Sequence, residues 1–182
     1  MAWRDKRKAM QAYDITAEMY DERYGEEQGR KYQKALESVD VVGEVILDAG
    51  CGSGLFFSQA ADQAKIVVGV DVSRKLLLKA NAQARDFGNV LLVHADADHL
   101  PFQDDLFGSV FGFTILQNMP KPTETLGELR RVAKIDAKIA VTGLKKFFPI
   151  EKFMDFLENS GMQIVAFMDD ELINCYIAVL AA

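Results

Sequence analysis

The chain has 182 residues, of which 49% are hydrophobic and 26% are charged, and its formal net charge is −6. This length and composition are typical of a globular domain with a hydrophobic core, which excludes a disordered segment. We expect residues 1–182 to form one single domain. The negative net charge opposes binding to a nucleic acid unless a local basic patch offsets it, so such a partner stays open but is not indicated.

No apolar run approaches the ~20 residues that a membrane helix needs, and the opening residues MAWRDKRKAM lack the apolar stretch of a signal peptide. We therefore expect a cytoplasmic protein that does not enter a membrane. The two cysteines, Cys51 and Cys175, lie far apart and form no CxxC pair. This spacing argues against a disulfide framework and against a zinc site, and no metal is expected.

Residues 1–38 are predicted to form an N-terminal helical segment. Small and aromatic side chains recur there at helical spacing, and two glycines interrupt the pattern. The recurring residues are Ala9, Tyr13, Ala17, Tyr20 and Tyr24, and the interruptions are Gly25 and Gly29. We expect two helices joined by a hinge.

From residue 42 onward, short β-rich runs alternate with helical stretches. The predicted strands cover residues 42–49, 65–72, 89–96, 108–116, 137–144, 162–170 and 173–182, and the predicted helices cover residues 55–63, 73–87, 122–134 and 149–161. This alternation favours the α/β class, with a Rossmann-like, doubly wound sheet of seven strands. The sheet is expected to be mostly parallel and to end in a C-terminal antiparallel hairpin.

The stretch VILDAGCGSG places three glycines directly after the first predicted strand. Gly50, Gly52 and Gly54 should therefore lie at the carboxyl edge of the sheet, where open α/β folds bind ligands. Glycine permits positive φ and lets a ligand approach the backbone closely, and a tight turn alone would need fewer glycines. The dinucleotide fingerprint GxGxxG would need its third glycine at Leu55, so the spacing here is GxGxG instead.

The loop DAGCGSG resembles the first motif of the class I S-adenosylmethionine-dependent methyltransferases, methyltransferase domain type 11. The resemblance continues through VGVDVS, HADADHLPFQDDLFGSVFG and FTILQNMPKPTETLGELRRVAK, and it is strongest for the branch of the menaquinone and ubiquinone methyltransferases. The similar part covers about residues 13–145. The resemblance implies S-adenosylmethionine as cofactor and transfer of its methyl group to an acceptor.

The resemblance also implies which residues contact the cofactor. Asp48 would hold the ammonium group directly or through water, and acceptance of hydrogen bonds from loop amides is a compatible alternative for it. Asp71 would accept both ribose hydroxyls, and Asp96 with the amide of Ala97 would meet the adenine. Val72 would form an apolar wall for the adenine, and plain core packing is an equal alternative for it. The implied cofactor-binding residues are Asp48, Gly50, Cys51, Gly52, Gly54, Asp71, Val72, Asp96, Ala97, Thr114, Tyr20 and Tyr24.

In the resembling branch, a tyrosine-containing N-terminal helix folds over the cofactor, and AYDITAEMYDERYG looks like that segment. Residues 1–38 would then act as a helical lid, with Tyr20 or Tyr24 in contact with the cofactor. The alternative is an amphipathic helix that packs its aromatic stripe on the sheet.

Methyl transfer depends on placement more than on a proton-transfer triad, because the sulfonium already activates the methyl group. The candidates beside the reacting methyl are Thr114, Gln117 and Asn118, whose hydroxyl and amides would orient an acceptor. Related enzymes with (N/D)PP(Y/F) at this place methylate planar nitrogens, and QNMP here leaves the acceptor atom open. His94 and His99 are interpreted as structural.

The stretch TGLKKFFPIEKF is short for a substrate-enclosing insertion, so we expect an open site. Lys145 and Lys146 at that edge hint at a large or anionic acceptor, which slightly favours RNA or protein over a small molecule. A partner subunit would supply the missing wall. Arg130 and Arg131 are interpreted as a solvated helix face.

Two other functions remain open. A catalytically silent scaffold subunit would still bind the cofactor, although it would not need to keep Asp48, Asp71 and Asp96. An NAD-dependent oxidoreductase would share the ribose-binding acid, but the loop at residues 50–55 and the terminal hairpin favour methyl transfer.

Overall fold

The computed structural model describes residues 25–182 of the chain. The strands are β1 (Val45–Ala49), β2 (Ile66–Asp71), β3 (Val90–His94), β4 (Phe107–Gly112), β5 (Ala133–Leu144), β6 (Gln163–Asp169) and β7 (Cys175–Ala181). The helices are α2 (Phe57–Ala60), α3 (Arg74–Ala84), η1 (Leu116–Asn118), α4 (Pro122–Val132) and α5 (Ile150–Glu158), and a further helix occupies residues 25–36. Within residues 25–182, no helix has the length and apolar character needed to cross a bilayer.

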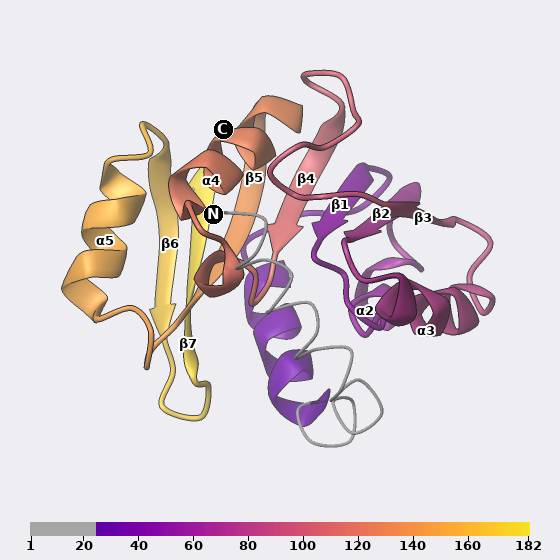
Figure 1. Cartoon of the computed structure of the whole chain (residues 1–182), viewed down its shortest axis with the longest axis horizontal. Coiled ribbons are helices and arrows are strands. Elements are labelled where there is room, and N and C mark those ends of the chain that lie inside the picture. The colour runs from indigo at the N-terminus through magenta and orange to yellow at the C-terminus, as the bar shows by residue number, and fades with distance from the viewer. Residues whose placement is uncertain (1–24) are drawn as a thin grey trace.

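The strands form one seven-stranded sheet in the order β3-β2-β1-β4-β5-β7-β6 (Figure 1). The pairs β1–β2, β1–β4, β2–β3 and β4–β5 are parallel, whereas β7 is antiparallel to both β5 and β6. These pairings confirm the predicted α/β fold with a mostly parallel sheet and a C-terminal antiparallel hairpin. The last strand does not extend the edge, because it inserts between β5 and β6.

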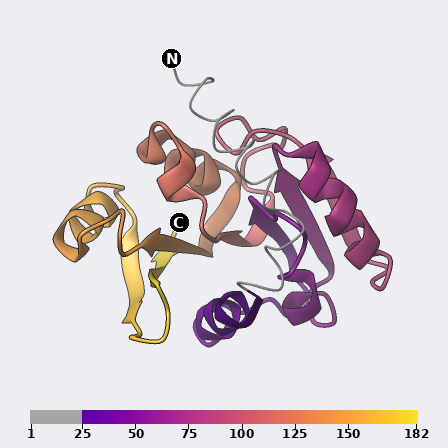
Figure 2. The same ribbon diagram turned by 60° about the horizontal axis from the view of Figure 1, so that its bottom comes forward.

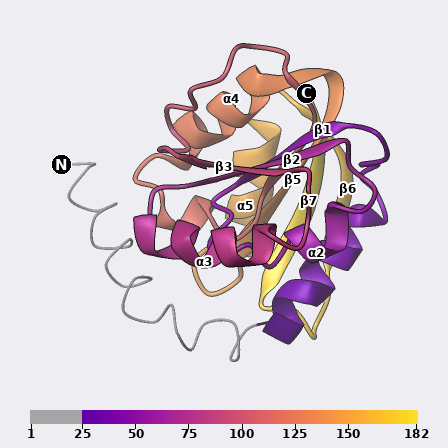
Figure 3. The ribbon, with the colours of Figure 1, turned by 90° about the vertical axis from the view of Figure 1, so that its right-hand side faces the viewer.

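Helices cover both faces of the sheet, so each face buries its own hydrophobic cluster. Phe57 of α2 and Ala80 of α3 belong to the cluster shared with helix 25–36, and Leu129 of α4 and Leu157 of α5 belong to the other. Figure 2 shows helix 25–36 and α4 on opposite sides of the strands. Figure 3 shows α4 above the strands, with α2, α3 and helix 25–36 below them. Parallel strands that are covered on both faces appear in the sequence as continuous apolar runs. The positions of these strands could therefore be predicted from the sequence.

Several elements differ from the sequence-based expectation; β5, for example, begins at Ala133 rather than at residue 137. Helix 25–36 runs through Gly29 without a break, because burial of Tyr32 and Ala35 outweighs the weak helix propensity of glycine. The expected interruption at Gly29 is therefore wrong, whereas a hinge before residue 25 would lie outside the described residues. Helix α2 is one turn long rather than the stretch 55–63, and β4 ends at Gly112 rather than at residue 116. The chain leaves β4 because Thr114 takes a positive φ of 58°.

Candidate functional site

The carboxyl ends of β1, β2 and β4 open into a cleft with a volume of about 140 Å³. The chain proceeds from β1 to β2 and β3 on one side, and then returns to place β4 on the other side of β1. Loops that leave neighbouring strands in opposite directions leave a crevice between them, and this is where open α/β sheets bind ligands. The topology therefore brings the strand-end side chains of three strands to one place.

Most of the residues expected to bind the cofactor line this cleft. They are Asp48, Gly50, Cys51, Gly52, Asp71, Val72, Asp96, Ala97 and Thr114. Gly54 is not among the lining residues, and Tyr20 and Tyr24 lie outside the described residues. Of the other two candidates beside the methyl group, Asn118 lines the cleft and Gln117 does not.

The glycines of the loop after β1 have different local roles. Gly50, Gly52 and Gly54 all take positive φ, at 77°, 57° and 89°, where an L side chain is strained. A Cβ on Gly54 would lie 2.5 Å from Cε2 of Phe57, so Gly54 permits close packing of the loop against α2. A Cβ on Gly52 would meet nothing within 4 Å, so Gly52 faces open space in the cleft.

Asp71, the last residue of β2, is held by two backbone amides. Gly52 N donates to Oδ2 at 2.9 Å, and Ser73 N donates to Oδ1 at 2.7 Å. A carboxylate has about four acceptor positions, so both oxygens keep capacity for a further donor. Burial raises the pKa of Asp71, and the amides of Ser73 and Gly52 oppose that rise. The arrangement presents a fixed, pre-oriented acceptor pair to the cleft.

Asp48, next to the end of β1, is buried, and its Oδ2 has no hydrogen-bond partner among the described residues. Burial, followed by the negative charge of Asp71, raises the pKa of Asp48 to about 8. No lysine or arginine of the described chain lines the cleft to compensate these acids. An unpaired buried carboxylate is costly, so a cationic ligand group is what this position fits. The ammonium group of S-adenosylmethionine meets that requirement.

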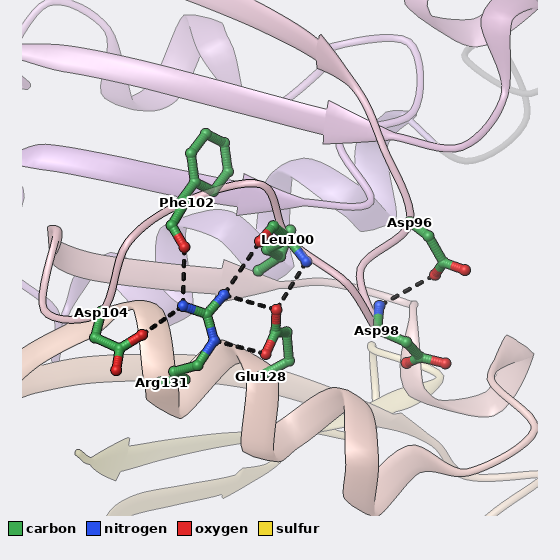
Figure 4. Close-up of polar contacts among 7 residues, drawn as sticks. All are labelled: Asp96, Asp98, Leu100, Phe102, Asp104, Glu128 and Arg131. Carbon is green, nitrogen blue, oxygen red and sulfur yellow. Dashed lines mark hydrogen bonds and ion pairs between the residues drawn. The ribbon is translucent and has the colours of Figure 1, made fainter.

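The loop after β3 carries Asp96 to the cleft, and its own backbone orients the side chain. Asp98 N donates to Oδ1 of Asp96 at 3.1 Å (Figure 4). Asp98 in turn accepts a short hydrogen bond from the Thr125 hydroxyl of α4. The contact with α4 holds the turn that contains Asp96.

Arg131 of α4 binds the same loop further along the chain (Figure 4). Its Nη1 donates to the Phe102 carbonyl at 2.8 Å and to Asp104 Oδ1 at 2.6 Å, and its Nη2 donates to the Leu100 carbonyl at 3.1 Å. Glu128 accepts from Nε and Nη2 of Arg131 and also from the Leu100 amide. Arg131 therefore connects α4 to residues 100–104 through hydrogen bonds. Its interpretation as part of a solvated helix face is wrong.

Helix 25–36 forms one wall of the cleft; residues 1–38 were expected to cover the cofactor, but the two residues that line the cleft were not among those singled out. Gln28 and Tyr32 lie one turn apart and both line the cleft. Asn174 Nδ2 donates to Glu27 Oε2 at 2.8 Å, and buried Lys31 pairs with Glu27 at 3.1 Å, which fixes the helix against the turn between β6 and β7. The only signal in the sequence was the four-residue spacing, because the helix reaches the cleft through contacts distant in sequence.

An aromatic cluster stands behind that wall. The centroid of the Tyr32 ring lies 4.9 Å from that of Phe113 and 5.1 Å from that of Phe56, and both pairs are edge-to-face. Phe113 also lines the cleft. Edge-to-face aromatic pairs at such distances are favourable and rigid. This end of the cleft is therefore apolar and shaped by rings.

Two basic side chains singled out in the sequence are engaged elsewhere. Lys145 Nζ pairs with Asp169 Oδ1 at 2.6 Å, donates to the Asp170 carbonyl at 2.8 Å, and does not line the cleft. His94 Nε2 lies 2.9 Å from the Val72 carbonyl, an arrangement that orients the chain after β2. Neither contact points to a role in acceptor chemistry.

Comparison with known proteins places this geometry in a family. The model of the methyltransferase domain family matches residues 47–141. A demethylmenaquinone methyltransferase of Staphylococcus saprophyticus is 40% identical over 96 residues, which cover 50% of this chain and 41% of that protein. The chain spans 41–51% of the length of the first curated relatives that it matches.

Solved structures show the same fold at low sequence identity. The magnesium protoporphyrin IX methyltransferase from Synechocystis PCC 6803, solved with bound SAM, has a TM-score of 0.79 at 18% identity, over 97% of this chain and 96% of that one. A methyltransferase of Haloferax volcanii, solved in complex with the Trm112 methyltransferase activator, has a TM-score of 0.76 at 16% identity, over 95% and 97%.

Proposed function

The chain belongs to the methyltransferase domain family of the class I S-adenosylmethionine-dependent methyltransferases, and we propose that it transfers a methyl group from S-adenosylmethionine to an acceptor in the cleft described above. The observation that carries the proposal is the buried, unpartnered carboxylate oxygen of Asp48 in a cleft lined by acids and by no basic residue of the described chain. A nicotinamide dinucleotide has no ammonium group to place beside Asp48, and its anionic pyrophosphate would be repelled by the acids of the cleft.

Methyl transfer requires the protein mainly to position the cofactor and the acceptor. The sulfonium of the cofactor supplies a methyl group that is already activated for displacement. In our proposal, Asp48 binds the ammonium group, Asp71 binds the ribose hydroxyls and Asp96 binds the adenine. Tyr32 and Phe113 exclude water from the acceptor side, so that an acceptor atom held in line with the methyl group meets little competition from solvent.

For the acceptor, we propose a small molecule with a planar apolar part. The described lining contains aromatic rings and no lysine or arginine, and Lys145 is bound by Asp169. These contacts weaken the case for the anionic or macromolecular acceptor that the sequence slightly favoured. The Staphylococcus saprophyticus relative bears the name of a quinone-modifying enzyme, which agrees with an apolar ring.

We propose further that a partner subunit completes the site and that the protein works in the cytoplasm. The cleft is open at its mouth, and the Haloferax volcanii relative was solved with an activator protein. Gel filtration and pull-down from the native source test the partner. Full activity of the isolated monomer would contradict it.

A transfer assay tests the proposed activity. Purified protein is incubated with S-adenosylmethionine labelled in the methyl group and with a reduced naphthoquinone, total RNA or a protein extract as acceptor. We expect label in the quinone fraction, and no label with the variant Asp71→Ala. Label in RNA or protein would support the proposed methyltransferase activity but would contradict the proposal of a small-molecule acceptor. Saturable cofactor binding without transfer to any acceptor, including in the presence of cell extract, would support the scaffold alternative.

A further inference from the structure

Helix α3 and the residue that follows it carry only positive charges. The stretch RKLLLKANAQAR at residues 74–85 contains no aspartate or glutamate, although the whole chain has a net charge of −6. Its basic residues are Arg74, Lys75, Lys79 and Arg85. The charge of this helix is therefore opposite to that of the chain as a whole.

Most of these basic side chains face solvent. Arg74, Lys75 and Arg85 are exposed, and Lys79 is half-buried. Within residues 25–182, the three exposed side chains take part in no ion pair. Their positive field is therefore available to an anionic partner.

An apolar side chain lies in the middle of these charges. Leu78 is 66% exposed, and residues 74, 78, 82 and 85 follow one another at the spacing that places side chains on one face of a helix. The residues of α3 that pack on the sheet, such as Leu76 and Ala80, are buried instead. We call the exposed set the α3 face; it consists of Arg74, Lys75, Leu78, Ala82 and Arg85.

The α3 face begins beside the cleft. The hydroxyl of Ser73 accepts a hydrogen bond from the Leu76 amide at 3.2 Å and caps the helix, and both residues line the cleft. Arg74 and Lys75 lie between them in the chain without lining the cleft. The helix covers the end of the sheet that carries the edge strand β3 (Figure 1). A surface that binds the α3 face would therefore lie within one helical turn of the cleft lining.

The chemistry of the α3 face fits the surface of an anionic lipid bilayer. Basic side chains near such a surface each improve partitioning about fivefold, and an apolar side chain beside them enters the boundary between headgroups and acyl chains. A nucleic acid would attract the charges but would leave Leu78 in solvent, and the α3 face offers no aromatic ring on which a base could stack. Leu78 is thus the residue that favours lipid over nucleic acid.

We propose that the α3 face docks the protein reversibly on an anionic membrane surface and thereby gives the cleft access to an acceptor dissolved in the bilayer. The docking does not depend on methyl transfer. The supply of the acceptor rests on the proposed function, because it assumes a small acceptor with an apolar part. Basic residues with a single leucine give weak, reversible binding, and the helix lies in the plane of the headgroups.

Sedimentation of the full-length protein with lipid vesicles tests the docking. Vesicles made of equal parts of phosphatidylglycerol and phosphatidylcholine should bind the protein, and vesicles of phosphatidylcholine alone should not. The triple variant Arg74→Gln, Lys75→Gln, Arg85→Gln should reduce the partition coefficient about a hundredfold. Leu78→Gln should reduce it about fivefold. Absence of binding to the anionic vesicles, or equal binding to both kinds, would overturn the proposal.

A matched variant separates the α3 face from the total charge. Arg130, Lys146 and Lys152 are exposed on α4, after β5 and on α5, so changing all three to glutamine removes the same charge elsewhere. This control should bind the anionic vesicles much more tightly than the triple variant of α3 does. Equal losses for the two would show that only net charge matters and would contradict docking through α3.

A nucleic acid is the competing occupant, and polyuridylic acid is its probe. The wild type should prefer the anionic vesicles when both are present. Binding of polyuridylic acid that the triple variant of α3 loses, without any binding to vesicles, would overturn the proposal in favour of an RNA surface.

Calorimetric titration with S-adenosylhomocysteine keeps the docking and the proposed function apart. The triple variant of α3 should bind this ligand as the wild type does, because none of the three residues lines the cleft. Binding of S-adenosylhomocysteine without binding to vesicles would refute the docking alone. Binding to vesicles without binding of S-adenosylhomocysteine would support the docking and refute the proposed function.

The supply of the acceptor is tested with two reduced naphthoquinones, one with a long apolar tail held in the anionic vesicles and one without a tail in buffer. The triple variant of α3 should lose most of the transfer to the first and retain the transfer to the second. Equal transfer by the variant and the wild type to both acceptors would contradict a role of the α3 face in acceptor supply.

Discussion

The amide of Gly52 and the carboxylate of Asp71 are joined by a hydrogen bond of 2.9 Å, which ties the glycine loop after β1 to the last residue of β2. The bond gives Asp71 two tasks, since the carboxylate orients the loop and also keeps acceptor positions for a ligand. The loop and the acid therefore form one unit, although 19 residues separate them in the chain.

Replacing Asp71 should affect ligand binding more than folding. Asp71→Asn offers one acceptor oxygen in place of two and loses the charge, so we expect S-adenosylhomocysteine affinity to fall by about tenfold or more. Calorimetric titration measures the loss. Asp62→Asn, the same change at an exposed position, is the matched control and should bind as the wild type does.

Asp48 predicts an unusual dependence of stability on pH. Its pKa is raised from 3.8 to about 8 in the folded protein, so the folded state keeps a proton that the unfolded state releases. Stability should therefore fall as pH rises from about 4 to about 8. Asp48→Asn removes this loss because the amide does not titrate.

Thermal denaturation across this pH range checks the expectation. Asp48→Asn should melt above the wild type at pH 8, and the difference should shrink toward pH 4, while S-adenosylhomocysteine binding is weakened. A difference in melting temperature that is constant with pH would show that Asp48 is ionised in the free protein.

Two glycines of the same loop should respond differently to alanine. Both substitutions strain a positive φ, at a cost of about 1–2 kcal/mol. Gly54→Ala also forces a Cβ to within 2.5 Å of the Phe57 ring, so its total loss should be about 3 kcal/mol. Gly52→Ala meets no protein atom, but its methyl group enters the cleft and should weaken S-adenosylhomocysteine binding.

Urea denaturation and titration separate these two roles. Gly127→Ala, at an exposed position of α4 with nothing within 4 Å, is the control and should stabilise the protein by about 0.5–1 kcal/mol. Equal stability losses for Gly52→Ala and Gly54→Ala, with binding intact in both, would show that no ligand uses the space beside Gly52.

Arg131 should matter for both the fold and the adenosine end of the cleft. Arg131→Met removes the donors that hold residues 100–104 to α4, and we expect a loss of about 1–2 kcal/mol, limited by the partial exposure of the side chain. The looser loop should also weaken 5′-methylthioadenosine binding through Asp96.

The neighbouring arginine gives a matched control. Arg130 is exposed on the same helix, so Arg130→Met should change neither the urea midpoint nor the affinity for 5′-methylthioadenosine. Identical behaviour of the two variants would mean that the hydrogen bonds of Arg131 do not contribute to the position of the loop.

The positions of the acidic residues Asp48 and Asp71 in the cleft could be predicted from the sequence for a physical reason. Asp48 and Asp71 each directly follow a buried apolar run, and parallel strands present their carboxyl ends at the same edge. The alternation of strands and helices likewise predicted the sheet. The sequence did not show that β7 inserts between β5 and β6, because a continuous apolar run such as β7 does not specify which strands are its neighbours.

The contacts that join distant segments were not predictable from local pattern. Tyr32 reaches the cleft because it packs on Phe56 and Phe113, which follow other strands. Arg131 resembled an ordinary surface charge, since its carbonyl partners lie 29 and 31 residues away. The conformation of Thr114 contradicts the strand propensity of its neighbours, and such conflicts between local preference and structure occur at functional sites.

The most direct test of the central claim is a calorimetric titration of the purified protein with S-adenosylhomocysteine and, separately, with a nicotinamide dinucleotide, repeated on Asp71→Ala. We expect saturable binding of S-adenosylhomocysteine that the variant loses, and no binding of the dinucleotide. Binding of the dinucleotide alone would contradict it.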